Sequence, residues 1–190
     1  AMIANWFNAK LKIQFPERKT IFGRRLKKLR YGENPHQTSS IYVNDYDDKQ
    51  LGFNQIHGKE LSYNNYSDMF ASLDIINSFK KRSGTVIIKH ANPCGVSENK
   101  VPLVSFQNAF ASDPISAFGG VIACNYKINK RIASEINKNF LEVLLAKGFD
   151  EESLKILKRK KNLRIIDISN FKPKNMTTIK SFDGSFLVQS

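Results

Sequence analysis

The sequence has few cysteines and no long apolar run. Cys94 and Cys124 are its two cysteines among 190 residues, and they fall in different segments, so the sequence does not encode a disulfide framework. No apolar run approaches the about 20 residues that a membrane-spanning helix needs. We therefore expect a protein of a reducing compartment, with a cytoplasmic location and no membrane partner.

Acidic residues are also scarce relative to basic ones. The chain has 17 Asp and Glu residues against 30 Lys and Arg residues, which gives a formal net charge of +13, and such an excess is compatible with nucleic-acid binding. The basic residues cluster at 24–28, 80–82 and 158–161, but no aromatic residues are interleaved with them and no helix-turn-helix, RNP or zinc-finger pattern is present. We interpret the clusters as solvated faces and predict no nucleic-acid partner. A basic RNA-binding module remains an alternative.

The composition is that of a globular protein with one substantial core, because 41% of the residues are hydrophobic and 25% are charged. From residue 65 onward, apolar runs of the buried-strand type alternate with stretches of helical periodicity. This alternation predicts an α/β protein built as a three-layer α/β/α sandwich. Strands are expected at residues 39–43, 86–88, 119–124, 140–146, 163–168 and 182–189, and helices at residues 69–79, 103–111, 130–139 and from 150.

Three further segments have local predictions. Residues 1–7 read as the tail of a helix begun upstream, and together with the strand-like run at the far end they predict a segment cut from a longer chain. Residues 45–50 are expected to form a polar turn, and residues 172–180 a basic loop.

A lysine and a histidine follow the apolar run at residues 86–88, which is predicted to be a strand buried on both faces. A proline and a glycine then predict a loop over residues 89–95. An ammonium group beside an imidazole disfavours the imidazolium, so His90 could accept a proton near pH 7, while Lys89 could stabilise a developing oxyanion. The spacing alone favours the alternative of a solvated lysine beside a packed histidine.

Four motifs support the catalytic interpretation. They are Arg-Tyr-Gly-Glu-Asn-Pro-His-Gln at residues 30–37, Leu-Ser-Tyr-Asn-Asn at 61–65, Lys-His-Ala-Asn-Pro-Cys-Gly at 89–95 and Ser-Ala-Phe-Gly-Gly at 116–120. Together they resemble the transformylase region of the AICAR transformylase/IMP cyclohydrolase family, and the resemblance runs over nearly the whole chain. It implies a fold similar to that of cytidine deaminase. The implied activity is AICAR formyltransferase in purine (IMP) biosynthesis, with 10-formyltetrahydrofolate as the co-substrate.

The resemblance also implies the site. His90 is the expected general base, and Lys89 is its electrostatic or acid partner. Arg30 and Tyr31 are expected to contact the AICAR nucleotide, since guanidinium geometry matches a phosphate. The further substrate-binding residues implied are Asn65, Phe118, Gly119 and Glu142. A carboxylate in an apolar strand is costly unless it is paired, so Glu142 should either lie at the exposed start of its strand or meet a donor.

The resemblance divides the chain into two parts. Residues 1–29 would be the tail of an upstream helix and a linker, and residues 30–190 the first half of the transformylase region. In the family an IMP cyclohydrolase domain precedes this region and the second half of the transformylase follows it. The complete protein is expected to be a homodimer that binds nucleotide and folate, and no metal is expected.

A zinc-dependent nucleoside deaminase is the alternative from another reaction class, because Pro93-Cys94 matches half of that signature. Zinc deaminases need a His/Cys-x-Glu element and a Pro-Cys-x-x-Cys pair. Here Ser97 occupies the position of the second cysteine, and Ala91-Asn92 follows His90 without a glutamate. The sequence therefore gives little support to zinc binding.

Overall fold

The computed structural model describes residues 2–43, 51–172 and 178–189. The polar turn predicted at residues 45–50 and the middle of the basic loop predicted at 172–180 lie outside the described residues.

A six-stranded mixed sheet forms the centre of the chain, with the strand order β3-β8-β7-β6-β4-β5. Strands β6, β7 and β8 are parallel, whereas β4 runs antiparallel to β6 and the two outer strands run antiparallel to their neighbours. The inner positions of the four central strands are buried, as expected for a sheet covered on both faces. The strands are β3 (Asn54–His57), β4 (Ser83–Lys89), β5 (Asn92–Asn99), β6 (Val121–Cys124), β7 (Val143–Ala146) and β8 (Arg164–Asp167).

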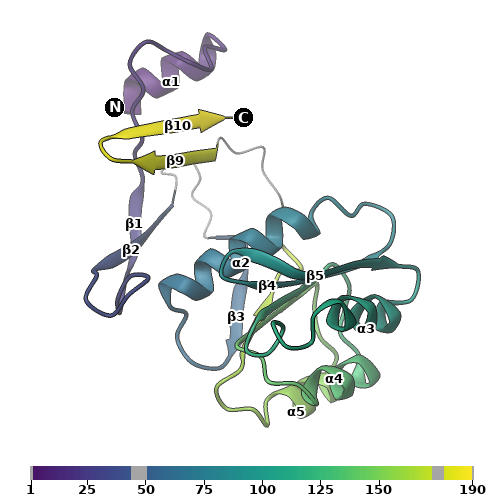
Figure 1. Ribbon diagram of the computed structural model, residues 1–190. Coiled ribbons are helices and arrows are strands. Elements are labelled where there is room, and N and C mark those ends of the chain that lie inside the picture. Colours follow the sequence, from purple (N-terminus) through teal and green to yellow (C-terminus); the bar gives the residue numbers. More distant parts are fainter. Residues whose placement is uncertain (1, 44–50, 173–177, 190) are drawn as a thin grey trace.

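Helices cover both faces of this sheet, which confirms the predicted three layers (Figure 1). Helix α2 (Tyr63–Ile76) packs on one face, where Met69 and Leu73 join a core with Val86 and Ile88 of β4. The other face is covered by α3 (Pro102–Ser112), α4 (Lys130–Asn137) and α5 (Glu151–Leu157). The α/β fold class predicted from the alternation of apolar runs with helical stretches is therefore correct.

Side-chain caps fix where three of these helices begin. Asn129 and Asp150 accept the backbone N–H of the third residue of α4 and of α5, the usual N-cap bond. In α2 the cap is Ser62, which forms a reciprocal capping box with Asn65. The capping-rich residues 64–68, expected to precede the helix, therefore lie inside its first turns.

The loop predicted at residues 89–95 is instead a tight hairpin, and this is a correction. Strand β4 ends at Lys89, which pairs with Asn92 at the start of β5, and only two residues separate the strands. Strand β5 was not predicted, because it is an outer strand of polar composition. Such a strand tolerates Pro93, which has no N–H to donate to a neighbour.

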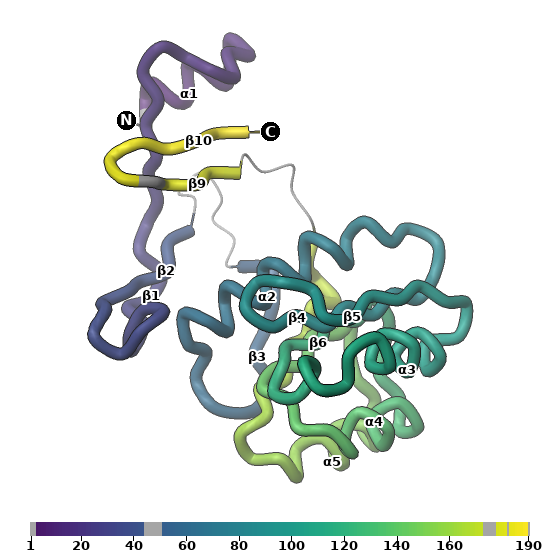
Figure 2. The backbone as a smooth tube through the Cα atoms, viewed as in Figure 1, coloured from purple at the N-terminus to yellow at the C-terminus, as the bar shows by residue number. Residues whose placement is uncertain are grey.

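The remaining elements stand off from the main sheet (Figure 2). Helix α1 (Met2–Lys10) is followed by a hairpin of β1 (Arg24–Leu29) and β2 (Ser39–Val43). A second hairpin joins β9 (Thr178–Phe182) to β10 (Ser185–Gln189). The single closing strand predicted at residues 182–189 is therefore wrong in its first residues, because a turn at Asp183 and Gly184 separates two paired strands.

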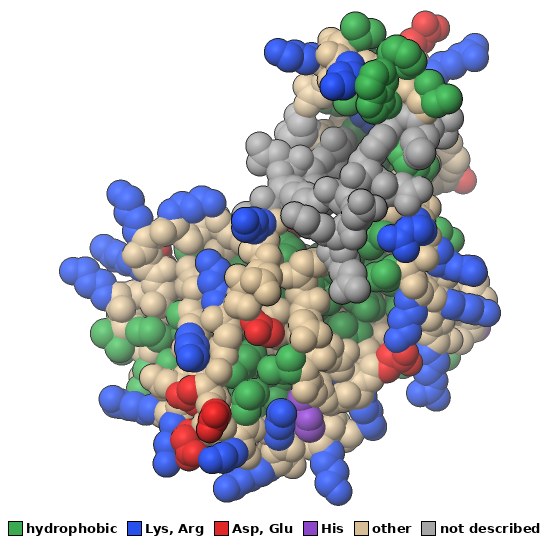
Figure 3. Space-filling view, turned by 180° about the vertical axis from the view of Figure 1, so that it is seen from behind, with side chains coloured by type: hydrophobic (Ala, Val, Ile, Leu, Met, Phe, Trp, Pro, Cys, Tyr) green, Lys and Arg blue, Asp and Glu red, His purple; other side chains and the backbone are tan. Residues whose placement is uncertain are grey.

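Basic side chains are scattered over most of the face seen in Figure 3. In the described ranges, no helix combines the length and the apolar character that crossing a membrane requires.

Candidate functional site

Most of the predicted site residues meet at one end of the central sheet, which we call the site end. Here the carboxyl end of β4 lies beside the amino end of β6, through the pair Ile88 and Val121. The parallel strands β7 and β8 begin at the same level, since Val143 pairs with both Val121 and Arg164. The site end thus combines the β4–β5 turn with the segments that lead into three parallel strands.

The β4–β5 turn places His90 in an uncommon backbone conformation. His90 has a φ of 78° and Ala91 a φ of 59°, and two consecutive positive φ values are the pattern of a type I′ hairpin turn. A positive φ is sterically unfavourable for residues other than glycine, so it is found where surrounding contacts stabilise it. The contact here is the Asp68 carboxylate of α2, which accepts the Ala91 N–H at 2.7 Å. The imidazole of His90 is consequently held in an exposed turn above the sheet.

Lys89 is directed at the segment before β6. Its Nζ donates to the carbonyl oxygen of Phe118 at 2.6 Å. Phe118 is 62% exposed as a residue, and its ring centroid lies 5.0 Å from that of Phe140. Gly119 follows with a φ of 73°, a conformation that glycine adopts without strain, and its N–H donates to the Phe140 carbonyl at 2.9 Å. Because β4 ends at Lys89, the lysine and the histidine need not point to opposite faces of a strand.

Glu142 lies immediately before β7 and is paired. Its Oε2 accepts from Nδ2 of Asn65 at 2.9 Å and lies 3.8 Å from a guanidinium nitrogen of Arg164. Its side chain is 47% exposed, so both conditions predicted for this carboxylate hold. Asn65 is buried, and its Oδ1 accepts the Ser62 N–H. Asn65 therefore acts on Glu142 and on the start of α2.

Arg30 and Tyr31 lie on the β1–β2 hairpin rather than on the central sheet. The Arg30 guanidinium is exposed and lies 5.8 Å from the centroid of the Tyr31 ring. Their segment reaches the site end through Asn64 at the start of α2, whose Nδ2 donates to the Glu33 carbonyl at 3.2 Å. Six of the eight predicted residues thus gather at the site end, and these two approach it on a separate element.

The same hairpin is tied to the central body by an ion pair between Lys27 and Glu60. The Lys27 ammonium is the main reason why the pKa of Glu60 is lowered from its usual value. Lys27 is therefore engaged, and the Arg30 guanidinium adds a weaker attraction that also lowers the pKa of Glu60.

Three residues of the site end were not predicted from the sequence. Asp68 holds the turn, Phe140 packs on Phe118, and Arg164 approaches Glu142. The signals were weak, because Asp68 reads as a helix-capping residue and the other two flank apolar runs. Each acts on a partner far away in sequence, which no local pattern reveals.

Cys94 does not face the site end. Its Sγ lies 3.5 Å from the Ile87 carbonyl, and the side chain packs against the core beneath α3. Burial raises the pKa of the Cys94 thiol, which disfavours the thiolate that a metal ion would need. Within residues 2–43, 51–172 and 178–189, no three His, Cys, Asp or Glu residues are grouped so that they could hold a metal ion.

Comparison with known proteins assigns the chain to a family of enzymes. Residues 1–190 match the AICARFT/IMPCHase bienzyme family, and the chain belongs to this family. It is 37% identical to the bifunctional purine biosynthesis protein PurH of Oceanobacillus iheyensis, over 100% of this chain and 38% of that protein. Identity to the PurH of Bradyrhizobium diazoefficiens is 42%, over 100% of this chain and 37% of that protein. The chain therefore spans a little over a third of the length of these relatives.

A third PurH, from Elusimicrobium minutum, is 46% identical over 87% of this chain and 31% of its own length. These matches confirm the resemblance read from the four motifs, and they favour neither the deaminase nor the RNA-binding alternative.

Similarity to solved structures is weaker. The dCMP deaminase of the cyanophage S-TIM5 gives a TM-score of 0.40 at 12% identity, over 53% of this chain and 94% of that one. RibD of Acinetobacter baumannii gives a TM-score of 0.41 at 13% identity, over 53% of this chain and 35% of that one. The family assignment rests on the sequence matches alone.

Proposed function

We propose that this chain carries part of an AICAR formyltransferase site, which transfers a formyl group from 10-formyltetrahydrofolate to the amine of AICAR. The observation that carries the proposal is the gathering of the Lys89-His90 turn with Phe118, Gly119 and Glu142 at one end of the sheet. Membership of the AICARFT/IMPCHase family supplies the reaction class.

The reaction requires one proton to leave the amine and another to reach the departing folate nitrogen. The amine nitrogen forms a bond to the formyl carbon, the bond from that carbon to the folate nitrogen breaks, and tetrahydrofolate leaves. The amine is a poor nucleophile because its lone pair is delocalised into the imidazole carboxamide. His90 acts as the proton acceptor, and a positioned base of this kind contributes about 10² to 10⁴-fold in rate.

Lys89 has the electrostatic role. Its ammonium, fixed on the Phe118 carbonyl at 2.6 Å, lies beside the turn that carries His90 and can stabilise an oxyanion on the formyl carbon.

The remaining site residues bind the substrate in this proposal. Arg30 and Tyr31 contact the nucleotide phosphate, Phe118 and Gly119 border its pocket, and Glu142, held by Asn65, accepts from an exocyclic amine or amide of the base. The exposed Arg30 guanidinium can form two parallel bonds to a phosphate.

The other parts of the proposal concern the complete protein. We propose that IMP cyclohydrolase activity, the homodimer, the rest of the folate site and a cytoplasmic location belong to it, as the family resemblance implies. Residues 1–29 as linker and 30–190 as half of the transformylase remain predictions. Holding two substrates in register contributes about 7 to 11 kcal/mol to lowering the reaction barrier. Because the family resemblance implies that other residues of the complete protein finish the folate site, we expect this chain alone to be inactive.

The test uses the full-length protein that contains this chain. His90→Ala should remove most turnover and leave nucleotide binding within about tenfold, because a proton acceptor acts mainly in the transition state. Tetrahydrofolate formation measures the turnover, and calorimetry measures the nucleotide affinity. Turnover close to that of the unmodified protein would rule out His90 as the base.

The binding roles have their own test. Arg30→Ala should weaken nucleotide binding by about 1.5 to 3 kcal/mol, the value of a charge-assisted hydrogen bond. Lys28→Ala is the matched control, because it removes an exposed cation of the same hairpin, whereas Lys27 is already paired with Glu60. Equal losses of nucleotide binding free energy in the two variants would mean that Arg30 contributes only general electrostatic attraction and no specific contact.

A further inference from the structure

A second candidate site lies at the opposite end of the central sheet, which we call the far end. Here β4 begins and the parallel strands β6 and β7 end, so Ser83, Asn125 and Lys147 come together. Crevices outside the carboxyl ends of parallel strands are the usual ligand sites of open α/β sheets. The far end contains a cavity of about 350 Å³.

Five cationic side chains line this cavity, which we call the basic groove. All five are exposed, and in the described part of the chain none of them forms an ion pair with a carboxylate. Among the described residues, no Asp or Glu lines the groove. Cations gathered without counter-charges repel one another, and an anionic ligand would relieve this repulsion. They are Lys80, Lys81, Arg82, Lys100 and Lys147.

The floor of the groove is held in place by Asn125. Its Oδ1 accepts the Gly84 N–H at 2.7 Å, and its Nδ2 donates to the Arg82 carbonyl at 2.9 Å. These bonds fix the segment between α2 and β4 to the end of β6. The backbone that carries Lys80, Lys81 and Arg82 is therefore preorganised, which lowers the cost of ordering the groove around a ligand.

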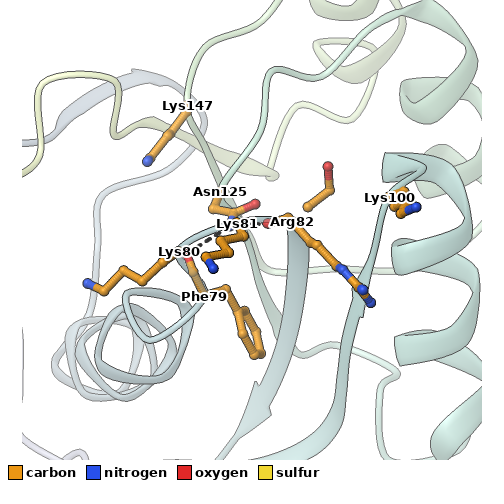
Figure 4. Close-up of a pocket in the computed structure, with 8 residues that line it drawn as sticks. Phe79, Lys80, Lys81, Arg82, Lys100, Asn125 and Lys147 are labelled. Atoms are coloured by element: carbon orange, nitrogen blue, oxygen red, sulfur yellow. Dashed lines mark hydrogen bonds between the residues drawn. The ribbon is translucent and has the colours of Figure 1, made fainter.

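The cations are spread along the groove rather than aimed at one point. Figure 4 shows Lys80 and Lys147 on one side of Asn125, and Arg82 and Lys100 on the other. A single phosphate could contact only part of this set, whereas an extended anion with several charges could contact both sides. Arg82 adds the planar guanidinium that binds phosphate oxygens in pairs.

A smaller hollow of about 170 Å³, lined by both apolar and polar side chains, adjoins the groove. Both cavities are lined by Phe79, Lys80, Asn125 and Lys147, and the hollow adds Ile76, Asn77, Ile168 and Phe171. The Phe79 ring lies directly against Gly84, where a Cβ would approach it to 2.2 Å, so this ring is fixed. An aromatic wall beside a row of cations suits a flat heterocycle joined to a chain of phosphates.

We propose that the basic groove and the adjoining hollow bind a nucleoside polyphosphate, with the base against Phe79 and Phe171 and the phosphates running from Lys80 toward Arg82 and Lys100. This site lies at the other end of the sheet from the proposed formyl-transfer site. Failure of the nucleoside polyphosphate proposal would therefore leave the formyl-transfer proposal unaffected, and the reverse also holds.

The test measures binding of ATP, inorganic tripolyphosphate and adenosine to the chain by calorimetry. ATP should bind at least about tenfold more tightly than tripolyphosphate, because a base stacked on an aromatic ring adds binding free energy. Affinity should also fall steeply as salt is added. Equal affinity for ATP and tripolyphosphate would overturn the role of the hollow, and no ATP binding at millimolar concentration would overturn the proposal.

Two variants of equal net charge locate the site. Arg82→Glu with Lys100→Glu reverses two cations of the groove, and Lys158→Glu with Lys161→Glu reverses two exposed cations elsewhere. The groove variant should lose at least about tenfold in ATP affinity, because it removes two charge-assisted contacts to the phosphates, while the control should change less than about twofold. Equal losses would overturn the proposal.

Amide chemical shifts give an independent location. On addition of ATP, the amides of residues 79–84, 125 and 147 should shift, and those of residues 89–92 and 118–120 should not. Shifts concentrated at the second set would place the ligand at the site end and overturn the assignment. Tighter binding of a single-stranded oligonucleotide than of ATP would do the same, because it would identify a nucleic-acid surface.

Discussion

The hydrogen bond from the Ala91 N–H to the Asp68 carboxylate joins α2 to the β4–β5 turn over 2.7 Å. Asp68→Ala removes the acceptor and leaves the strained turn without its support. A hydrogen bond to a charged group is worth about 1.5 to 3 kcal/mol, and partial solvation of Asp68 places it near the lower end. Alanine favours the helix over aspartate by up to about 0.7 kcal/mol, which offsets part of the loss.

Asp74→Ala is the matched control, because Asp74 is exposed on the same helix and forms no described contact with the turn. It gains the same helix propensity and loses no turn contact. The two variants should therefore differ by about 1.5 kcal/mol in unfolding free energy, or about 3 to 6 °C in Tm for a chain of this size. Urea titration and thermal melting measure the difference. Equal stability of the two variants would refute the role of Asp68 in holding the turn.

Two further predictions concern the scaffold. Gly95→Ala should destabilise the chain, because a Cβ at Gly95 would lie 2.0 Å from the Ala109 carbonyl oxygen. Overpacking of this kind costs about 1 to 3 kcal/mol of unfolding free energy. An unchanged urea midpoint would show that α3 and β5 can move apart at no cost. Asp150→Ala should cost about 1 kcal/mol at pH 7 through the lost cap of α5. The Ser153 N–H lowers the pKa of Asp150 from 3.8, so the charged cap contributes above the unfolded pKa, and the cost should shrink as the pH falls through the lower folded value. A cost that persists at pH 2 would mean that the charge is irrelevant.

Strands buried on both faces were the easiest elements to predict. The uninterrupted apolar residues at 86–88, 121–124, 143–146 and 165–166 became the inner positions of β4, β6, β7 and β8, and the periodic stretches between them became α3, α4 and α5. The outer strands β3 and β5 were missed because they are polar. Their pairing is decided by neighbours distant in sequence, and residues 92–95 carry turn signals that belong to the end of β4.

The site was predictable where a motif is contiguous. Lys89 and His90 were found together, but Asp68, which fixes their turn, comes from another helix. The basic groove shows the same limit. Its central cluster at residues 80–82 was interpreted as a solvated face. Lys100 and Lys147 lie far from this cluster in sequence, and only the folded sheet places them beside it.

The three contacts that tie α2 and β3 into place close loops of very different size. Asp68 and Ala91 are 23 residues apart, Asn65 and Glu142 are 77 apart, and His57 and the Lys160 carbonyl are 103 apart. Each doubling of a loop adds about 0.6 kcal/mol of closure entropy. The helix and the hairpin can therefore meet early in folding, before β7 and β8 are in place. The contact of Asn65 with Glu142 needs the segment that leads into β7, so we expect this part of the site end to form after the β4–β5 turn.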